Sequence, residues 1–108
     1  MSHTYIPDIA AEVPVPEDGT LSRVLYRDDR VRLVGFAFDV GQELTEHTAA
    51  VPVLVQVVTG RFAATVGSDT LTLEPGGWLR MDAHVPHSLR ALEPSVMLLT
   101  MLPGPRPT

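Results

Sequence analysis

The chain has 108 residues and a formal net charge of −5, it contains no cysteine, and all 8 of its basic residues other than histidine are arginine. This length fits one domain, and the absence of cysteine excludes disulfides, thiolate metal sites and cysteine nucleophiles. The acidic balance argues against a general binder of nucleic-acid backbones, and no apolar stretch approaches the roughly 18 residues that a membrane span needs.

The first segment, residues 1–19, is predicted to be an extended arm. Its prolines at positions 7, 14 and 16 disfavour a helix longer than one turn, which we expect near "PDIAAE". The opening "MSHTYIPDIA" lacks the basic and apolar regions of a signal peptide. We therefore expect a soluble cytoplasmic protein.

Residues 20–102 predict a single all-β domain of about nine short strands. Turn signals recur roughly every 8–12 residues, which is the spacing typical of a sandwich or small barrel. The segment "GRFAATVGSDTLTLEPGG" predicts a hairpin with its turn at "GSD". The remaining strands are predicted in "TLSRVLYR", "VRLVGFAFDV", "GQELTEHT", "VPVLVQVVT", "WLRM", "SLRAL" and "SVMLLTML", and residues 103–108 are predicted to be a flexible tail.

Two histidines stand at a spacing that resembles the cupin superfamily. Gly41, five residues and His47 match the start of the first cupin motif, and Gly60 stands where its closing glycine belongs. The stretch "GGWLRMDAHVPHSLRA", which ends the second motif at His87, matches the later glycine, strand and histidine turn. The resemblance covers roughly residues 20–102 and points to small single-domain cupins of unassigned activity. It implies a double-stranded β-helix, a jelly-roll barrel with a ligand site at its open mouth.

The resemblance also implies a metal site, from which this sequence departs. The superfamily holds its metal with four side chains, and His47 and His87 match the first and the last. Ala49 and Val53 occupy the other two positions. Two imidazoles alone bind a divalent ion weakly, because zinc sites use at least three protein ligands. The best candidate for a third ligand to zinc, nickel, iron or manganese is His84, in a loop whose shape the sequence does not define.

Strand alternation predicts the wall of the ligand site. If Val53 faces the barrel interior, Val55 and Val57 share its face and Gln56 points outward. We expect Val53, Val55 and Phe62 to line an apolar wall, with His47 and His87 as polar contacts. Val57, Ala64 and Leu89 are further candidates for the same wall.

Three functions remain open at this point. The first is a small-molecule-binding protein with a degenerate metal site. The second is a metal-dependent dioxygenase or isomerase of a small organic substrate, and either histidine could also act as a general base without metal. The third is a structural or regulatory dimer module. We expect a homodimer that buries the outward face around Gln56, although the N-terminal arm could cover that face instead.

Two further features have simple structural interpretations. The run "RDDRVR" predicts a solvated turn with local ion pairs, which are worth little energetically. Trp78 is expected to be a core or interface aromatic rather than a wall of the ligand site, and Met97 and Met101 are expected to be packing residues.

Overall fold

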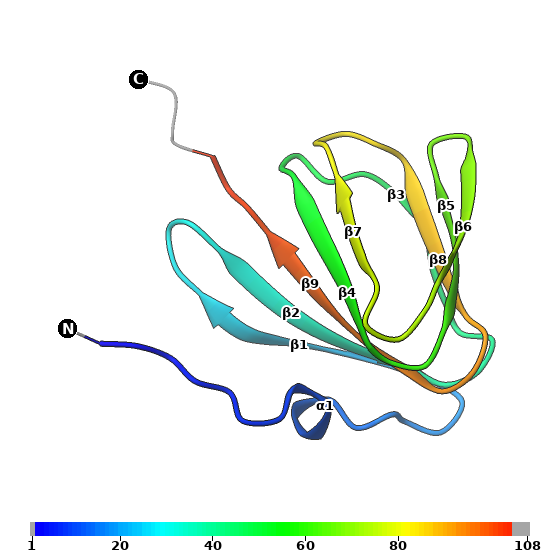
Figure 1. The fold of residues 1–108 in the computed structure, drawn as a ribbon, viewed down its shortest axis with the longest axis horizontal. Coiled ribbons are helices and arrows are strands. Elements are labelled where there is room, and N and C mark those ends of the chain that lie inside the picture. The colour runs from blue at the N-terminus through cyan, green and yellow to red at the C-terminus, as the bar shows by residue number, and fades with distance from the viewer. Residues whose placement is uncertain (1, 105–108) are drawn as a thin grey trace.

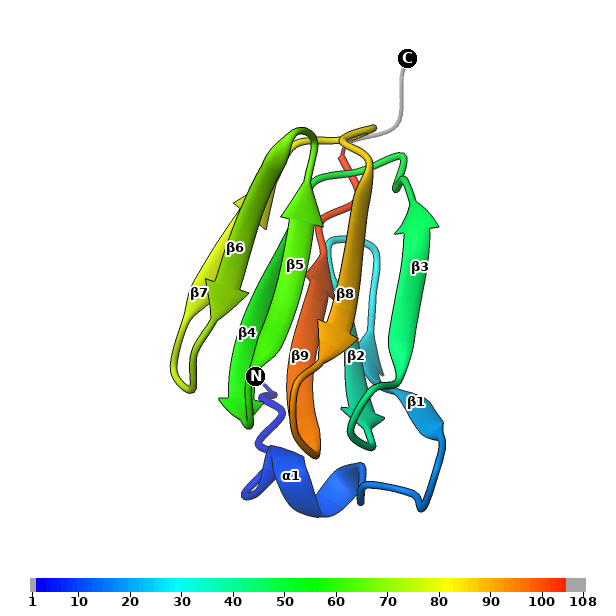
Figure 2. The same cartoon turned by 90° about the vertical axis from the view of Figure 1, so that its right-hand side faces the viewer.

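The computed structural model describes residues 2–104, which form two antiparallel sheets packed face to face (Figures 1 and 2). The five-stranded sheet has the order β1-β2-β9-β4-β7, and the four-stranded sheet has the order β3-β8-β5-β6. The elements are α1 (Ile9–Glu12), β1 (Thr20–Arg27), β2 (Arg32–Phe38), β3 (Glu43–His47), β4 (Val53–Thr59), β5 (Phe62–Val66), β6 (Asp69–Leu73), β7 (Trp78–Met81), β8 (His87–Ala91) and β9 (Ser95–Met101).

The predicted all-β architecture is confirmed, and the nine strands form where the sequence places them. The hairpin β5–β6 turns at residues 67–68 and pairs Phe62 with Leu73. The expected single helical turn is α1, and the Asp8 side chain accepts a hydrogen bond from the Ala11 N–H at 3.4 Å. A short polar residue at this position satisfies one of the amide groups that a helix start leaves unpaired.

The hydrophobic core fills one half of the space between the sheets. Phe38 and Phe62, both fully buried, pack edge to face with ring centroids 5.4 Å apart. Phe36 stacks on Phe38 at 5.9 Å and is itself only partly buried. The aromatic cluster therefore closes the packed half of the barrel and leaves Phe36 at its boundary. The other buried members of this cluster are Val53, Val55, Val57, Ala64, Leu73, Met81, Leu89, Ala91, Met97 and Leu99.

The N-terminal arm packs on the outer face of the five-stranded sheet, below it in Figure 1. Val13 is fully buried there against Ala37 and Val96, with Leu21 and Val58 at the margin. The arm therefore covers part of this outer face but not the part around Gln56, which one of the two sequence interpretations expected it to cover. Gln56 lies outside the covered part and is exposed, which confirms that it points outward.

The turn between β1 and β2 is held by hydrogen bonds rather than by the predicted ion pairs. The Asp28 carboxylate accepts hydrogen bonds from the backbone N–H groups of Arg30 and Val31 at 2.8 and 3.0 Å, and from the Tyr26 hydroxyl at 2.6 Å. These bonds lower the pKa of Asp28 below its ordinary value, the Tyr26 hydroxyl having the largest effect. Within residues 2–104, the ion pairs join Arg23 to Glu12, Arg61 to Glu74 and Arg80 to Asp82, so none lies in this turn.

The segment after β9 is short in the described part of the chain. Of the predicted flexible tail, residues 105–108 lie outside the described residues, and residues 103 and 104 follow β9 without regular secondary structure. Among the described residues, the single short helix is far below the length and apolarity that crossing a bilayer requires.

Candidate functional site

The two histidines of the sequence motifs meet side by side in the four-stranded sheet. His47 at the end of β3 pairs with His87 at the start of β8, and their ring centroids are 4.1 Å apart at an interplanar angle of 61°. A register shift in β3 lies between Leu44 and His47. Residues three apart in a regular strand point to opposite faces, so this bulge is what turns both Leu44 and His47 toward the barrel interior.

Each histidine is oriented by a backbone carbonyl two residues before it. Nδ1 of His47 lies 2.7 Å from the Thr45 oxygen, and Nδ1 of His87 lies 2.9 Å from the Val85 oxygen. A carbonyl can only accept, so Nδ1 carries the proton on both rings. In the neutral imidazole, Nε2 is then the free acceptor. Both rings therefore present the nitrogen that would accept from a ligand or bind a metal ion.

His87 is kept neutral by its surroundings. Burial lowers the pKa of His87 below its ordinary value, and the neighbouring His47 lowers it further, while the bond to the Val85 carbonyl opposes both. The side chain is only 4% exposed. Among the described residues, every fully buried side-chain nitrogen or oxygen has a hydrogen-bond partner. Nε2 of His87 has no such partner, so it is not fully buried and reaches the cavity surface.

A cavity of about 500 Å³ opens in front of the histidine pair, between the two sheets. It also contains Ala49 and Val53, the residues at the two ligand positions that this chain has replaced. The four positions thus converge on one space, as the motif spacing predicts. The full lining is Ser22, Val24, Arg32, Val34, Phe36, Leu44, His47, Thr48, Ala49, Ala50, Val53, His87, Leu99 and Met101.

Of the residues predicted for the apolar wall, Val53 lines this cavity, whereas Val55 and Phe62 do not. Val55 and Phe62 are 1% and 0% exposed, belong to the packed core and do not line this cavity. Strand alternation placed Val55 on the correct face but not at the correct depth. Phe36 lines the cavity, whereas Phe38, on which it stacks, is fully buried in the core.

The predicted third metal ligand does not join the pair. His84 is exposed, lies in the β7–β8 loop with a positive φ of 69°, and donates its backbone N–H to the Ala49 carbonyl at 2.7 Å. Across residues 2–104, no group of three His, Cys, Asp or Glu side chains is placed to hold a metal ion. Two imidazoles facing an alanine and a valine do not fit the metal that the superfamily implies.

Sequence reasoning missed the polar residues that the β1–β2 hairpin brings to the cavity. Arg32 begins β2 rather than ending the turn, and Ser22 of β1 and Thr48 after β3 also line the cavity. The available signal was the alternation in "VRLVGFAF", where Arg32 shares a strand face with Val34 and Phe36. Met101, expected to be a packing residue, also lies on the cavity surface.

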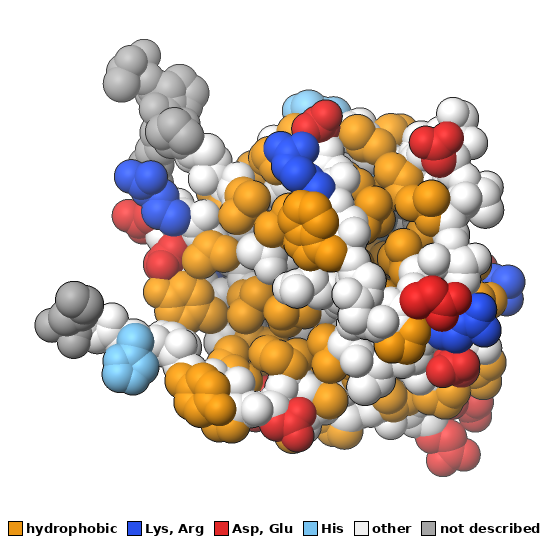
Figure 3. Space-filling model, in the orientation of Figure 1, with side chains coloured by type: hydrophobic (Ala, Val, Ile, Leu, Met, Phe, Trp, Pro, Cys, Tyr) orange, Lys and Arg blue, Asp and Glu red, His pale blue; other side chains and the backbone are white. Residues whose placement is uncertain are grey.

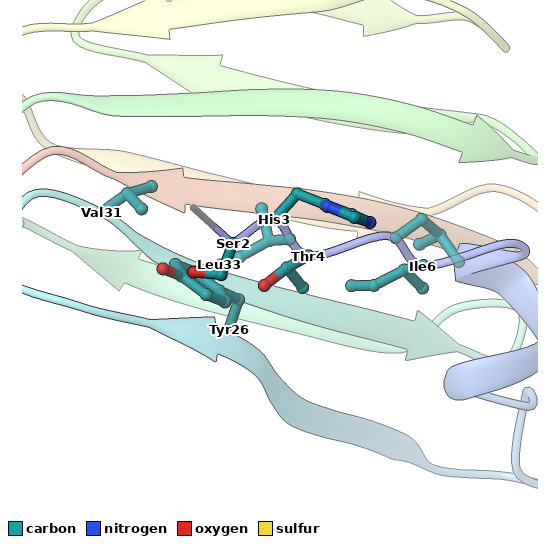
Figure 4. A pocket seen from close by; sticks show the side chains of 8 residues that line it. Ser2, His3, Thr4, Ile6, Tyr26, Val31 and Leu33 are labelled. Atoms are coloured by element: carbon teal, nitrogen blue, oxygen red, sulfur yellow. The ribbon is translucent and has the colours of Figure 1, made fainter.

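A second cavity of about 510 Å³ lies on the outer side, between the arm and the β1–β2 hairpin (Figure 4). Ser2, His3, Thr4 and Ile6 of the arm face Tyr26 and Leu33 across it. The Tyr26 hydroxyl already donates a hydrogen bond to Asp28, and the arm that forms the other wall of this cavity has only one helical turn. The cavity between the sheets, framed by strands on both sides, is the stronger candidate site.

Comparisons with known proteins agree with the geometry. No protein-family model matches the chain, and no curated protein matches it. Among solved structures, a conserved protein of unknown function from Streptococcus pyogenes is 28% identical with a TM-score of 0.86, covering 98% of this chain and 93% of that one. A cupin superfamily protein from Desulfitobacterium hafniense is 24% identical with a TM-score of 0.83, covering 94% and 93%.

A third solved structure is described by its fold. It is an uncharacterised conserved protein with a double-stranded β-helix domain from Klebsiella pneumoniae, 17% identical with a TM-score of 0.82, covering 94% of this chain and 92% of that one. These likenesses extend over almost the whole chain, arm included. The chain therefore has the double-stranded β-helix fold, and the solved structures that share this fold include one described as a cupin superfamily protein.

Proposed function

We propose that this protein binds a small organic molecule in the cavity between the sheets without a resident metal ion. The observation that carries the proposal is the pair of Nε2 atoms, which the Thr45 and Val85 carbonyls fix as acceptors facing an otherwise mostly apolar cavity. Such a pair recognises a hydroxyl or amine that donates hydrogen bonds. We place this function in the reducing cytoplasm, which the absence of cysteine favours.

The cavity has the dimensions of a small-molecule site. Its volume of about 500 Å³ lies within the usual range for such sites. Val24, Val34, Phe36, Leu44 and Leu99 supply apolar surface. A few polar groups in an apolar enclosure are what gives a binding site orientation and specificity.

The residues beside the histidines favour binding over catalysis. Ser88, which follows His87, and Glu46, which precedes His47, line a groove on the other face of the four-stranded sheet and not the cavity. Neighbouring residues of a strand point to opposite faces, which explains this orientation. The cavity lining supplies the hydroxyls of Ser22 and Thr48 but no carboxylate and no third metal ligand, so recognition is the best-supported role for the histidine pair.

His47→Ala is expected to abolish ligand binding with little change in stability, because the half-buried His47 ring contributes little to the core. The measurement is a nuclear magnetic resonance screen with small alcohols and phenols, together with thermal melting. Ser88→Ala is the matched control, since Ser88 neighbours His87 on the opposite face. Binding should also weaken in acid as His87 is forced to protonate and Nε2 ceases to accept. Unchanged binding by His47→Ala would overturn the proposal.

Elemental analysis decides between this proposal and the metal-dependent enzyme. Tag-free protein is expected to carry no stoichiometric metal and to bind zinc, nickel, iron(II) and manganese(II) weakly. Stoichiometric metal that disappears in both His47→Ala and His87→Ala would contradict the proposal and support a dioxygenase or isomerase.

We also propose that the protein is a homodimer, through an outer patch that the arm leaves uncovered. The patch consists of Leu54, Gln56, Trp78 and Leu98. Gln56 pairs in register with Trp78 on one side and Leu98 on the other. Trp78 is 60% exposed and Gln56 is exposed, while Leu54 and Leu98 are partly exposed. Hydrophobic side chains cover much of the face shown in Figure 3, with most charges nearer its margins. A second copy of the same patch would bury these side chains.

Trp78→Asp is expected to convert the dimer to a monomer in analytical ultracentrifugation. Leu71→Asp is the control, because Leu71 is an exposed apolar residue of β6 in the other sheet. Trp78 is the single tryptophan of the chain, so its emission should shift to longer wavelength when the wild-type dimer is diluted. A wild-type protein that stays monomeric at high concentration would contradict the dimer.

A further inference from the structure

The charges around the cavity are of one sign. Its lining includes one guanidinium, from Arg32, and two imidazoles, from His47 and His87, but no aspartate or glutamate. This is notable in a chain with 13 acidic residues and a net charge of −5. The cavity thus lacks the carboxylates that are plentiful elsewhere in the sequence. With the imidazoles neutral, Arg32 supplies the charge of the cavity lining.

Arg32 has no internal partner that would explain its place. The ion pairs within residues 2–104 use Arg23, Arg61 and Arg80, and none uses Arg32. Asp28, in the turn before Arg32, already accepts hydrogen bonds from two backbone N–H groups and from the Tyr26 hydroxyl. Within the described part of the chain, no ion pair therefore occupies the Arg32 guanidinium, which can donate hydrogen bonds to a ligand in the cavity.

A second arginine stands directly opposite Arg32. Arg27 at the end of β1 is its partner in the β1–β2 ladder. Side chains opposite each other in an antiparallel pair lie on the same face of the sheet, where like charges destabilise the pair. No described ion pair relieves Arg27 either. An anion placed at this rim would remove the repulsion.

Arg32 and the two histidines line the cavity from opposite sheets. Along one row of the five-stranded sheet, Arg32 pairs with Met101 and Met101 pairs with Val53. Two strand spacings, about 10 Å, therefore separate Arg32 from Val53 at the level of the backbone. The histidine pair belongs to the facing sheet. The cavity thus has a cationic group from one sheet, a neutral acceptor pair from the other, and apolar side chains between them.

We propose that the cavity selects a carboxylate-bearing ligand, with Arg32 binding the carboxylate, the apolar wall enclosing a hydrocarbon body, and the histidine pair accepting a hydrogen bond from a hydroxyl farther along it. This inference rests on the proposed binding function and names its ligand class, a hydroxylated organic acid. The planar guanidinium matches a carboxylate with two parallel hydrogen bonds. The many apolar lining residues distinguish this class from small inorganic anions, which could satisfy Arg32 alone.

The test compares two probes that differ in one group, 6-hydroxyhexanoate and 1,6-hexanediol, by calorimetric titration of the wild type and of Arg32→Gln. The wild type is expected to bind the hydroxy acid more tightly than the diol. Arg32→Gln should weaken the hydroxy acid by about tenfold or more, the size expected for losing a charge-assisted hydrogen bond, and should leave the diol unchanged. Added salt should weaken only the hydroxy acid, because Arg32 is exposed and its field is screened.

Two other results would count against the inference, and they differ in what they leave standing. Equal affinity for both probes, or an Arg32→Gln variant that weakens both alike, overturns the carboxylate subsite while the proposed binding function stands. No binding of either probe, in a protein whose melting temperature is normal, overturns both. Arg90→Gln serves as a charge-matched control, because Arg90 is exposed on β8 outside the cavity lining, and it should leave the affinity for the hydroxy acid unchanged.

Discussion

Val55→Asp is expected to prevent folding. Val55 is 1% exposed, belongs to the core cluster, and lies in register between Leu79 of β7 and Leu99 of β9. A carboxylate there has no partner and either remains charged in an apolar site or is forced to protonate. Either outcome costs several kcal/mol. Because a domain of this size has a free energy of unfolding of about 5–15 kcal/mol, most of its stability is lost.

The matched control for this variant is the adjacent residue. Gln56→Asp introduces the same carboxylate one position along β4, but on the exposed face. Because Gln56 also belongs to the proposed dimer patch, Gln56→Asp is expected to give a folded monomer whose melting temperature is close to that of Trp78→Asp. Circular dichroism and thermal melting of both variants are the measurements. A folded Val55→Asp protein that unfolds cooperatively would contradict the placement of Val55 on the inward face of β4.

Gly60→Ala is expected to destabilise the protein by roughly 2–5 kcal/mol. Gly60 has a φ of +80°, where a residue with a Cβ is disfavoured by about 1–2 kcal/mol. An added Cβ would also overlap Ser95 and lie 2.7 Å from the Pro94 carbonyl oxygen. Ser95 is fully buried, where its hydroxyl accepts the Arg61 N–H at 3.0 Å and lies 2.7 Å from the Glu93 carbonyl oxygen, to which it donates. Overpacking of this kind adds about 1–3 kcal/mol.

Gly41→Ala separates the two causes. Gly41 has nearly the same φ, +81°, but an added Cβ would meet nothing within 4 Å. It therefore reports the backbone preference alone, and the difference between the two variants reports the overlap with Ser95. Denaturant unfolding of both is the measurement. Equal destabilisation of the two would show that Ser95 moves aside freely, contrary to this explanation. The closing glycine of the first motif is thus required by the packing of the β4–β5 turn.

Most of the fold was predictable because its signals are local. The prolines, the turn glycines and the alternating apolar residues each act within a few positions of the chain, and together they located all nine strands. The "GSD" turn and the short helix at Ile9–Glu12 are cases in point. The placement of His47 beside His87 followed from the motif spacing of the resemblance rather than from local pattern.

The details of the site were less predictable, because they depend on how the two sheets meet. Alternation shows which side of β4 faces inward, but not that Val53 at the start of β4 lines the cavity while Val55 lies in the core. Arg32 was assigned to a solvated turn because a charged run usually is one. The predicted strand "VRLVGFAFDV" includes Arg32, but the sequence alone does not show that the face of β2 carrying Arg32 borders the cavity.

The bulge in β3 and the position of this strand in its sheet have a mechanical consequence. His87 stands on β8, which is hydrogen-bonded to β3 on one side and to β5 on the other. His47 stands on β3, an edge strand bonded only to β8 through an interrupted register. Strands with fewer ladder bonds open at lower free energy. The two rings are therefore held unequally: His87 is on a strand that is paired on both sides, and β3, which carries His47, is the strand expected to open first.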